Sequence, residues 1–344
     1  MILLNSAPRP GAANRNSENI DVKQWLIFAV KAIVSGLLIW WLLERIDPAP
    51  VLEGLSRVSA GPLIAALVAL MVAAGLLAFR WTAVNRRLEI ALQLARAFRL
   101  TLIALFFSQT LPSTIGGDVA RVWFVYRGGV PMDRAVSSII LDRLCALAAL
   151  LLIVGLSLPA LFSMIDDPTP RWSVPLLAAL GACGFGMLFL LGGRWGRLFD
   201  RWAATRPILK LARDARCVLV PDVGLVAIFA PAVTIHLLSV FAVWLIAQSI
   251  AAEISLLHCL VFVPPVILIS MVPISVAGWG IREGAMIVAF GFVGVPEADA
   301  LVVSILFGLT LIAAGAPGGV LWLSEGRSAR QGFDLAQETK RSES

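Results

Sequence analysis

Long apolar blocks separated by short polar stretches run through most of the sequence. A membrane-spanning helix needs about 20 mostly apolar residues. Six blocks reach that length, at roughly 24–43, 62–80, 135–158, 174–192, 223–248 and 299–323. The blocks are continuous and do not alternate residue by residue, which argues against an outer-membrane β-barrel. The pattern therefore predicts an all-α polytopic membrane protein with six spanning helices.

Two more apolar stretches, 98–126 and 256–293, are each interrupted near the middle by proline and glycine. The interrupting runs are Leu111-Pro112-Ser113-Thr114-Ile115-Gly116-Gly117-Asp118 and Val272-Pro273-Ile274-Ser275-Val276-Ala277-Gly278-Trp279-Gly280. The arms on either side, of about 10–17 residues, are too short to cross a bilayer comfortably. Irregular backbone at membrane depth needs protein or a water-filled cavity around it. We therefore predict two re-entrant hairpins, each of which enters and leaves on one side.

The distribution of charged residues predicts which segments are cytoplasmic. Only 15% of the residues are charged, and 28 Lys and Arg against 22 Asp and Glu leave a net charge of +6. In a membrane protein such an excess indicates topology and lipid contact rather than nucleic-acid binding. Basic residues concentrate at the exit of the first hairpin and in four segments, 1–23, 80–99, 193–221 and 326–344. If these are cytoplasmic, the hairpins open to opposite sides. Arg80 then lies in an inner loop, and Arg282 is the only basic residue of the second hairpin, which opens outside.

The same assignment predicts the cellular location and the parts of the chain. We expect a bacterial inner-membrane protein with both termini in the cytoplasm. Its parts would be a cytoplasmic N-terminal segment over 1–23, a membrane domain over 24–325 and a disordered cytoplasmic tail over 326–344. The first apolar block has no small-residue cleavage site, so we expect no cleavable signal peptide.

The two predicted hairpins resemble each other. Both contain the same landmarks in the same order: Pro112 and Pro273, Gly117 and Gly278, Arg121 and Arg282, then Gly129-Val130-Pro131 and Gly294-Val295-Pro296. We interpret them as parts of two copies of one unit, about 62–158 and 223–323, in opposite orientations. Inverted repeats with broken helices near the midplane are typical of transporters.

The returning arm of each hairpin would begin with unpaired N–H groups and the positive end of a helix dipole, a geometry that binds phosphate. Arg121 and Arg282 follow the tips by about one turn, and arginine can bind phosphate through two parallel hydrogen bonds. We expect each tip to bind a phosphate-bearing headgroup, with the help of Ser113, Gly116, Gly117 and Gly278. The alternative is that the glycines only permit close helix packing while the arginines reach the membrane interface.

Further ionisable residues lie near these positions. Asp118 either stabilises the dipole of the returning arm or balances Arg121. Asp142 and Arg143 lie about two turns into the third span, where ionisable residues are costly and usually face an interior cavity. Adjacent helix positions do not face each other, so each needs its own partner. Asp142 is a candidate partner of Arg121, Arg143 could instead reach the cytoplasmic face, and Glu283 is the acidic candidate at the second hairpin.

The polar segment 193–221 contains an amphipathic pattern. Trp195, Leu198, Phe199 and Trp202 recur at helical spacing, with arginines among them. This predicts a helix on the cytoplasmic leaflet that is attracted by anionic lipid, or alternatively a surface for a regulatory partner. The sequence contains no nucleotide-binding loop, metal-ligand cluster or Ser/His/Asp set, so we expect no cofactor, no metal and no enzymatic activity.

At these motifs the sequence resembles the flippase-like family, which is the membrane region of lysylphosphatidylglycerol synthases and their stand-alone relatives. The resemblance covers about 25–325 and implies movement of a lipid, often an aminoacylated or glycosylated anionic one, between leaflets. The family often has Glu at the position of Asp142. By motif match, its polar residues here would be Asp118, Arg121, Asp142, Arg143, Arg282 and Glu283.

Three functions are compatible with these features. The first is a lipid flippase or scramblase for an anionic lipid or lipid-linked precursor. The second is an accessory membrane subunit that scaffolds a lipid- or glycan-modifying enzyme. The third is an intramembrane transferase, which would need an acid or base beside the phosphate, and only Asp118, Asp142 and Glu283 offer one.

Overall fold

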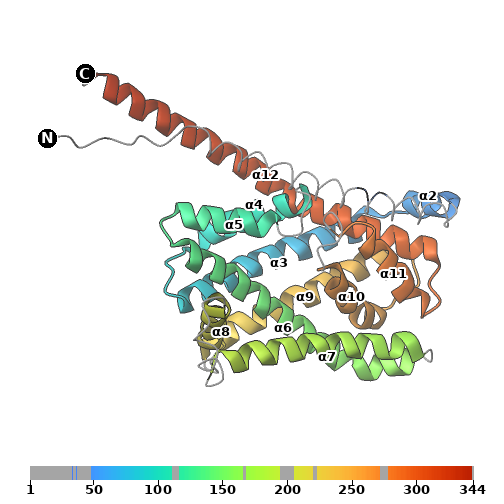
Figure 1. The fold of residues 1–344 in the computed structure, drawn as a ribbon. Coiled ribbons are helices and arrows are strands. Elements are labelled where there is room, and N and C mark those ends of the chain that lie inside the picture. The colour runs from blue at the N-terminus through green and yellow to red at the C-terminus, as the bar shows by residue number, and fades with distance from the viewer. Residues whose placement is uncertain are drawn as a thin grey trace.

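The computed structural model describes residues 48–110, 116–165, 168–193, 205–219, 223–271 and 278–342, together with the single positions 33 and 36. Within these ranges every regular element is a helix, α2 to α12 (Figure 1). The span predicted at 24–43 lies outside the described residues, apart from those two positions. The residues 111–115 and 272–277, which contain the predicted hairpin tips, also lie outside them.

Five helices of the described part are long and apolar enough to cross a membrane. They are α3 (Ala60–Arg87), α6 (Met132–Met164), α7 (Pro168–Leu191), α9 (Val223–Ser249) and α12 (Glu297–Ser342). Five of the six predicted spans are thereby confirmed as helices. Several of these helices extend beyond their apolar blocks. Only the first turn of a helix is costly to form, so a helix continues into the following residues while they favour it.

Each interrupted stretch forms two short helices. The first gives α4 (Leu94–Thr110) and α5 (Gly116–Arg127), and the second gives α10 (Leu256–Ser270) and α11 (Ile281–Gly291). The helices of a pair are antiparallel neighbours. In the first pair, Gly117 lies against Ala104 while Gly128 lies against Arg96. The predicted breaks are therefore confirmed, with arms of 17, 12, 15 and 11 residues.

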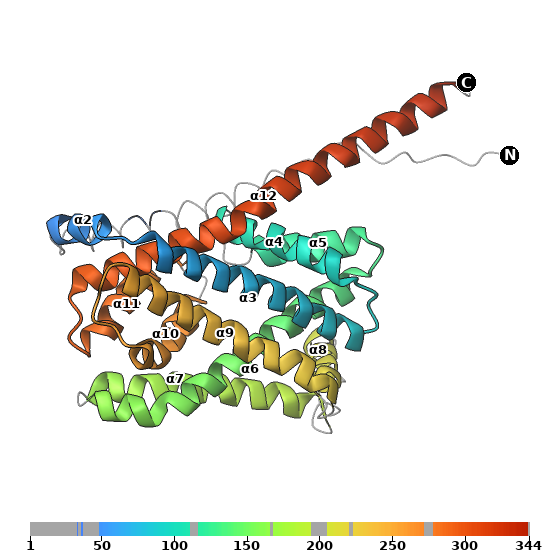
Figure 2. The same ribbon diagram turned by 180° about the vertical axis from the view of Figure 1, so that it is seen from behind.

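The centre of the bundle is the contact between α3 and α9, which lie side by side in both views (Figures 1 and 2). They run in opposite directions, since the backbone N–H of Ser59, just before α3, donates to the carbonyl of Ser249 at the end of α9 (2.8 Å). Around this centre α4 packs against α12, and α10 packs against α6.

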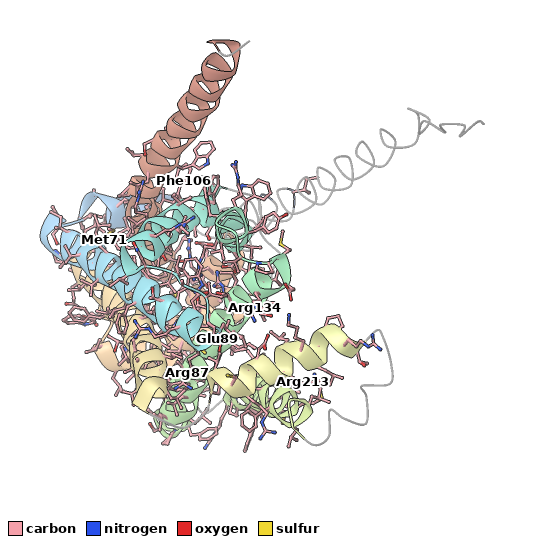
Figure 3. The ribbon with its side chains drawn as sticks, turned by 90° about the vertical axis from the view of Figure 1, so that its left-hand side faces the viewer. Met71, Arg87, Glu89, Phe106, Arg134 and Arg213 are labelled. Atoms are coloured by element: carbon pink, nitrogen blue, oxygen red, sulfur yellow. The ribbon has the colours of Figure 1, made fainter. Side chains whose placement is uncertain are left out.

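The periphery holds three further helices. The short α2 (Pro48–Ser56) packs against α12. α7 packs against α6 and α8 (Arg206–Val218). α8 buries one face, which includes Leu209 and Ala212, and lies at the end of the bundle that Figure 3 views, where Arg87, Arg134 and Arg213 are labelled. The tryptophans of the predicted amphipathic pattern lie outside the described residues.

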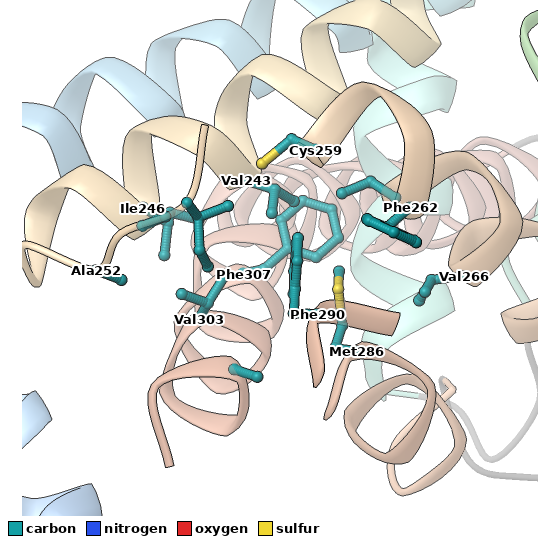
Figure 4. Packing of buried hydrophobic residues seen from close by; sticks show 14 of the residues in the cluster. Val243, Ile246, Ala252, Cys259, Phe262, Val266, Met286, Phe290, Val303 and Phe307 are labelled. Carbon is teal, nitrogen blue, oxygen red and sulfur yellow. The ribbon is translucent and has the colours of Figure 1, made fainter. Parts of the chain in front are cut away.

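The largest hydrophobic core lies among α9, α10, α11 and α12 (Figure 4). Phe262 of α10 and Phe290 of α11 are in edge-to-face contact, with ring centroids 6.3 Å apart. Met286 and Val303 complete the packing around Phe290. Helices that are apolar all round, such as α10, are typical of such buried positions.

The turns that follow α5 and α11 have the same backbone geometry. Val130 N–H donates to the Val125 carbonyl (3.4 Å), and Val295 N–H donates to the Phe290 carbonyl (3.2 Å). In both turns the glycine before the valine has a left-handed backbone, with φ of +91° at Gly129 and +78° at Gly294. Glycine ends helices in this way because it has no Cβ to clash. The recurrence of Gly-Val-Pro thus corresponds to a recurring turn.

The last helix extends far beyond its predicted span. Helix α12 continues to Ser342, through most of the 326–344 segment for which the sequence pattern predicts a disordered tail. Extending an existing helix is easier than starting one, and this segment contains alanine, glutamine, lysine and arginine, which favour helices.

Gly129→Ala and Gly294→Ala should each lower the free energy of unfolding by roughly 1–2 kcal/mol, the usual penalty of a left-handed backbone for a residue with a Cβ. A Cβ at either position would meet no atom within 4 Å, so the effect is conformational and not steric. Thermal unfolding in detergent micelles measures it. Gly155→Ala in α6 is the matched control, because its surroundings are equally open and its backbone is helical. Equal destabilisation by all three variants would contradict the role of φ.

Candidate functional site

The carboxylate of Asp142, on α6, is fully buried and binds two arginines from other helices. Arg80 of α3 donates from Nε to Oδ1 at 2.9 Å. Arg121 of α5 donates from Nη1 and Nη2 to Oδ2 at 3.2 and 3.1 Å. The predicted pairing of Asp142 with Arg121 is confirmed. One carboxylate therefore joins α3, α5 and α6.

The predicted position of Arg80 is wrong. The topology assignment puts it in an inner loop, but it lies inside α3 and is 2% exposed. Helical residues continue after it, because Trp81, Val84 and Asn85 are also buried. That continued pattern of buried positions, with no turn residue between them, is the signal that could have placed Arg80 inside the protein.

A second ion pair extends this group toward the surface. Asp118 of α5 accepts two hydrogen bonds from Arg143 of α6, from Nε at 2.8 Å and from Nη2 at 3.0 Å. It also lies 3.7 Å from Nη1 of Arg121. The side chain of Arg143 is 47% exposed and that of Asp118 is 15% exposed. Asp118 thus balances Arg121 only at longer range, and its close partner is Arg143, which the sequence did not indicate.

Uncharged side chains hold the arginine network in place. The guanidinium of Arg121 lies over the ring of Trp81, 3.9 Å from its centroid. The indole N–H of Trp81 donates to Ser138 Oγ (2.9 Å), and Ser138 Oγ donates to the side-chain oxygen of Asn85 (2.8 Å). These buried contacts fix α3 against α6 and keep the Trp81 ring beneath the cation, an arrangement that stabilises a desolvated guanidinium.

The predicted tip glycines have different roles. A Cβ at Gly117 would overlap the carbonyl oxygen of Ala104 and Oγ of Ser108, so this glycine allows α4 and α5 to approach closely. Gly116 is buried at the first position of α5. Gly278 has φ of +82°, which favours glycine for conformational reasons. Ser113 lies outside the described residues.

The second candidate site is formed by Arg282 and Glu283, at the start of α11. Arg282 donates from Nη2 and Nε to Glu283 Oε1 (2.6 and 3.1 Å), and Ser304 Oγ of α12 donates to the same oxygen (3.2 Å). Glu283 Oε2 accepts the backbone N–H of Gly280 at 2.6 Å. Arg282 also lies 4.8 Å from the ring centroid of Trp279.

The position of Arg282 explains its unusual partner. Arg282 lies in the returning arm, as predicted, and its side chain is buried (5% exposed) against Gly308 of α12. Neighbouring residues on a helix do not usually face each other. They pair here because Glu283 folds back to cap the N-terminus of its own helix, which brings its carboxylate to the side chain of Arg282.

Asp142→Asn should lower the free energy of unfolding by about 3–5 kcal/mol, because Arg80 and Arg121 would lose the carboxylate that compensates them. Thermal unfolding in detergent micelles reports the loss. Asp133→Asn, which removes an exposed carboxylate that pairs with Lys210 of α8, is the control and should leave the transition unchanged. A transition in Asp142→Asn equal to that of the unaltered chain would show that the buried network is not needed for stability.

Comparison with known proteins agrees with the polytopic helical architecture. The family described as the lysylphosphatidylglycerol synthase TM region matches residues 28–318, which is most of the chain. No curated protein matches the sequence. The match includes every helix of both candidate sites, from α3 to the part of α12 that carries Ser304. The chain therefore belongs to the lysylphosphatidylglycerol synthase transmembrane-region family of multi-pass membrane proteins.

Proposed function

We propose that the protein is a flippase- or scramblase-type transporter, which moves an anionic, phosphate-bearing lipid or lipid-linked precursor between leaflets. The observation that carries the proposal is the network around Arg121, in which three guanidinium groups and two carboxylates run from the buried Asp142 to the half-exposed Arg143 and leave a net charge of +1. Ionisable groups inside a membrane domain are expensive and usually serve a polar pathway. Ion pairs that only stabilise the fold would need equal numbers of positive and negative groups.

We also propose that α4–α5 and α10–α11 are re-entrant hairpins in an inverted repeat. If helices α3 to α6 form the first repeat and helices α9 to α12 form the second, α4 corresponds to α10 and α12 corresponds to α6. The packing of α4 on α12 then corresponds to the packing of α10 on α6. The shared turns after α5 and α11 support the same correspondence. Because α3 and α9 are equivalent and antiparallel, the repeats would be related by an axis in the membrane plane, as in many transporters.

The orientation in the membrane follows from the basic end of the bundle. Arg87, Arg134 and Arg213 lie at the end that Figure 3 views, on α3, α6 and α8. The positive-inside rule assigns such an end to the cytoplasm. We therefore propose a bacterial inner-membrane location with both termini cytoplasmic.

The two arginine–carboxylate pairs suggest how a phosphate could bind without leaving an unpaired charge in the interior. Arg121 is held by Asp142, and a phosphate oxygen would replace one anionic acceptor by another. Arg282 is held in the same way by Glu283. Rocking of one repeat against the other would then present these sites to the two leaflets in turn. No covalent bond of the lipid is made or broken in this transport step.

Reconstitution in liposomes tests transport directly. The unaltered chain should accelerate the movement of fluorescent phosphatidylglycerol between leaflets, measured by reduction of the outer label with dithionite. Arg121→Gln and Arg282→Gln should each slow this movement by about tenfold or more, which corresponds to ~1.4 kcal/mol in the barrier. Arg121→Lys keeps the charge beside Asp142 but loses the planar fork, so it should fold and remain slow.

Arg57→Gln is the matched control, since Arg57 forms an exposed surface pair with Glu53. It should transport like the unaltered chain. Absence of movement for phosphatidylglycerol and for a polyprenyl-phosphate lipid would refute the transport proposal.

The accessory-subunit alternative rests on α8, where Ile208 is exposed on a helix rich in basic residues. In that case substitutions on α8 would abolish the activity of a lipid-modifying partner, whereas Arg121→Lys would leave it intact.

A further inference from the structure

One nitrogen of the arginine network is left without a partner. Nε of Arg121 is buried and donates to no atom of the described residues, while Nη1 and Nη2 both bind Asp142. A guanidinium offers five N–H donors in a fixed plane. An unpaired donor in the interior is costly, and such groups call for an occupant such as an ion or a ligand oxygen.

A second buried group without a partner lies on α4, which packs against α5. Oγ1 of Thr101, on α4, is buried and has no partner among the described residues. The register between α4 and α5 is antiparallel, because Gly117 lies against Ala104 and Gly128 lies against Arg96. This register puts Arg121 opposite Thr101. A hydroxyl and an N–H donor, both buried and both unsatisfied, thus lie across one helix–helix contact.

The charge around this contact is not balanced. The charged groups that act on Arg121 are Asp142, Asp118, Arg143 and Arg80. With Arg121 itself they form three cations and two anions, so the group carries one positive charge that the described residues do not neutralise. All of these groups except the half-exposed Arg143 lie in the interior, where charge is favourable only when it is compensated. An occupant with one negative charge would compensate it, whereas one with two negative charges would leave a net charge of −1.

We propose that the α4–α5 contact at Arg121 Nε and Thr101 Oγ1 binds an oxyanion with a single negative charge, the state of a phosphodiester, and discriminates against the doubly charged phosphomonoester. The network that contains Arg121 extends to the surface at the half-exposed Arg143. The inference rests on the proposed function and narrows its substrate class. The Arg282 site contributes no such selection, because Arg282 and Glu283 neutralise each other.

Equilibrium binding to the purified full chain in detergent tests the selectivity. The probes are short-chain phosphatidylglycerol, short-chain phosphatidic acid and dimethyl phosphate, at about pH 8.5, where a phosphomonoester carries two charges. Phosphatidylglycerol should bind more tightly than phosphatidic acid by about tenfold or more. Dimethyl phosphate with an affinity like that of phosphatidylglycerol would identify a site for free monoanions. Much weaker binding of dimethyl phosphate would identify a lipid-headgroup site.

Charge-changing variants separate the proposal from simple lipid binding. Asp118→Asn removes one negative charge and so raises the net charge of the network by one, so the preference for phosphatidylglycerol should disappear or reverse. Arg143→Gln removes one positive charge and should weaken both lipids by about fivefold or more, since no excess cation remains. Thr101→Val conserves volume and should weaken phosphatidylglycerol alone. Asp133→Asn, outside the network, should keep the selectivity of the unaltered chain.

Two results would overturn the inference. One is equal affinity of the unaltered chain for phosphatidylglycerol and phosphatidic acid. The other is an unchanged ratio in Asp118→Asn, with its folding verified by thermal unfolding. Selective binding without any lipid movement in liposomes would refute transport and leave the site in place. Lipid movement without selective binding would refute the site and leave transport in place.

Discussion

The buried carboxylate of Asp142 is the constraint on which the first half of the structure depends. A lone carboxylate in an apolar bundle is unstable, so α6 can place Asp142 inside only if cations arrive from neighbouring helices. Arg80 and Arg121 meet this requirement from α3 and α5. The relative positions of the three helices are therefore fixed by hydrogen bonds with definite directions, which apolar packing alone does not provide.

Close backbone contact gives these short helices a rigid support. Gly117 lets α5, which carries Arg121, lie directly against α4. α4 in turn lies against α12, where a Cβ at Gly318 would overlap the carbonyl of Leu102. Interfaces of small residues are typical of helix packing in membranes, since they bring backbones together. The position of Arg121 is thus linked, through α4, to the last long helix of the second half.

The sequence predicted the parts of the fold that depend on local chemistry. Apolar length identified five helices, and the proline and glycine runs located both breaks. The Asp142–Arg121 pair was also predictable, because two opposite charges in apolar surroundings have few other partners. These inferences needed only hydropathy, helix-breaking residues and the cost of buried charge.

The errors concern residues whose environment is decided by distant partners. Hydropathy treats every arginine as a residue that prefers water, so it put Arg80 in a loop. Arg80 is buried because it pairs with Asp142, which lies 62 positions later in the sequence and so gives no local signal. The Asp118–Arg143 pair was missed for the same reason, because only the packing of α5 on α6 brings the two side chains together.

The two candidate sites solve the same electrostatic problem in different ways, and the difference bears on how a transporter could work. At the first site the compensating anion comes from another helix. The distance between Arg121 and Asp142 therefore depends on how α5 packs against α6. At the second site the anion is the next residue, so Arg282 keeps its partner however α11 moves relative to α12. A change in helix packing would therefore alter the charge balance of the first site and leave that of the second almost constant. If the two halves rock against each other, the first site is the one whose affinity for an anion changes with conformation, and differential affinity of this kind is what allows a ligand to drive a transition.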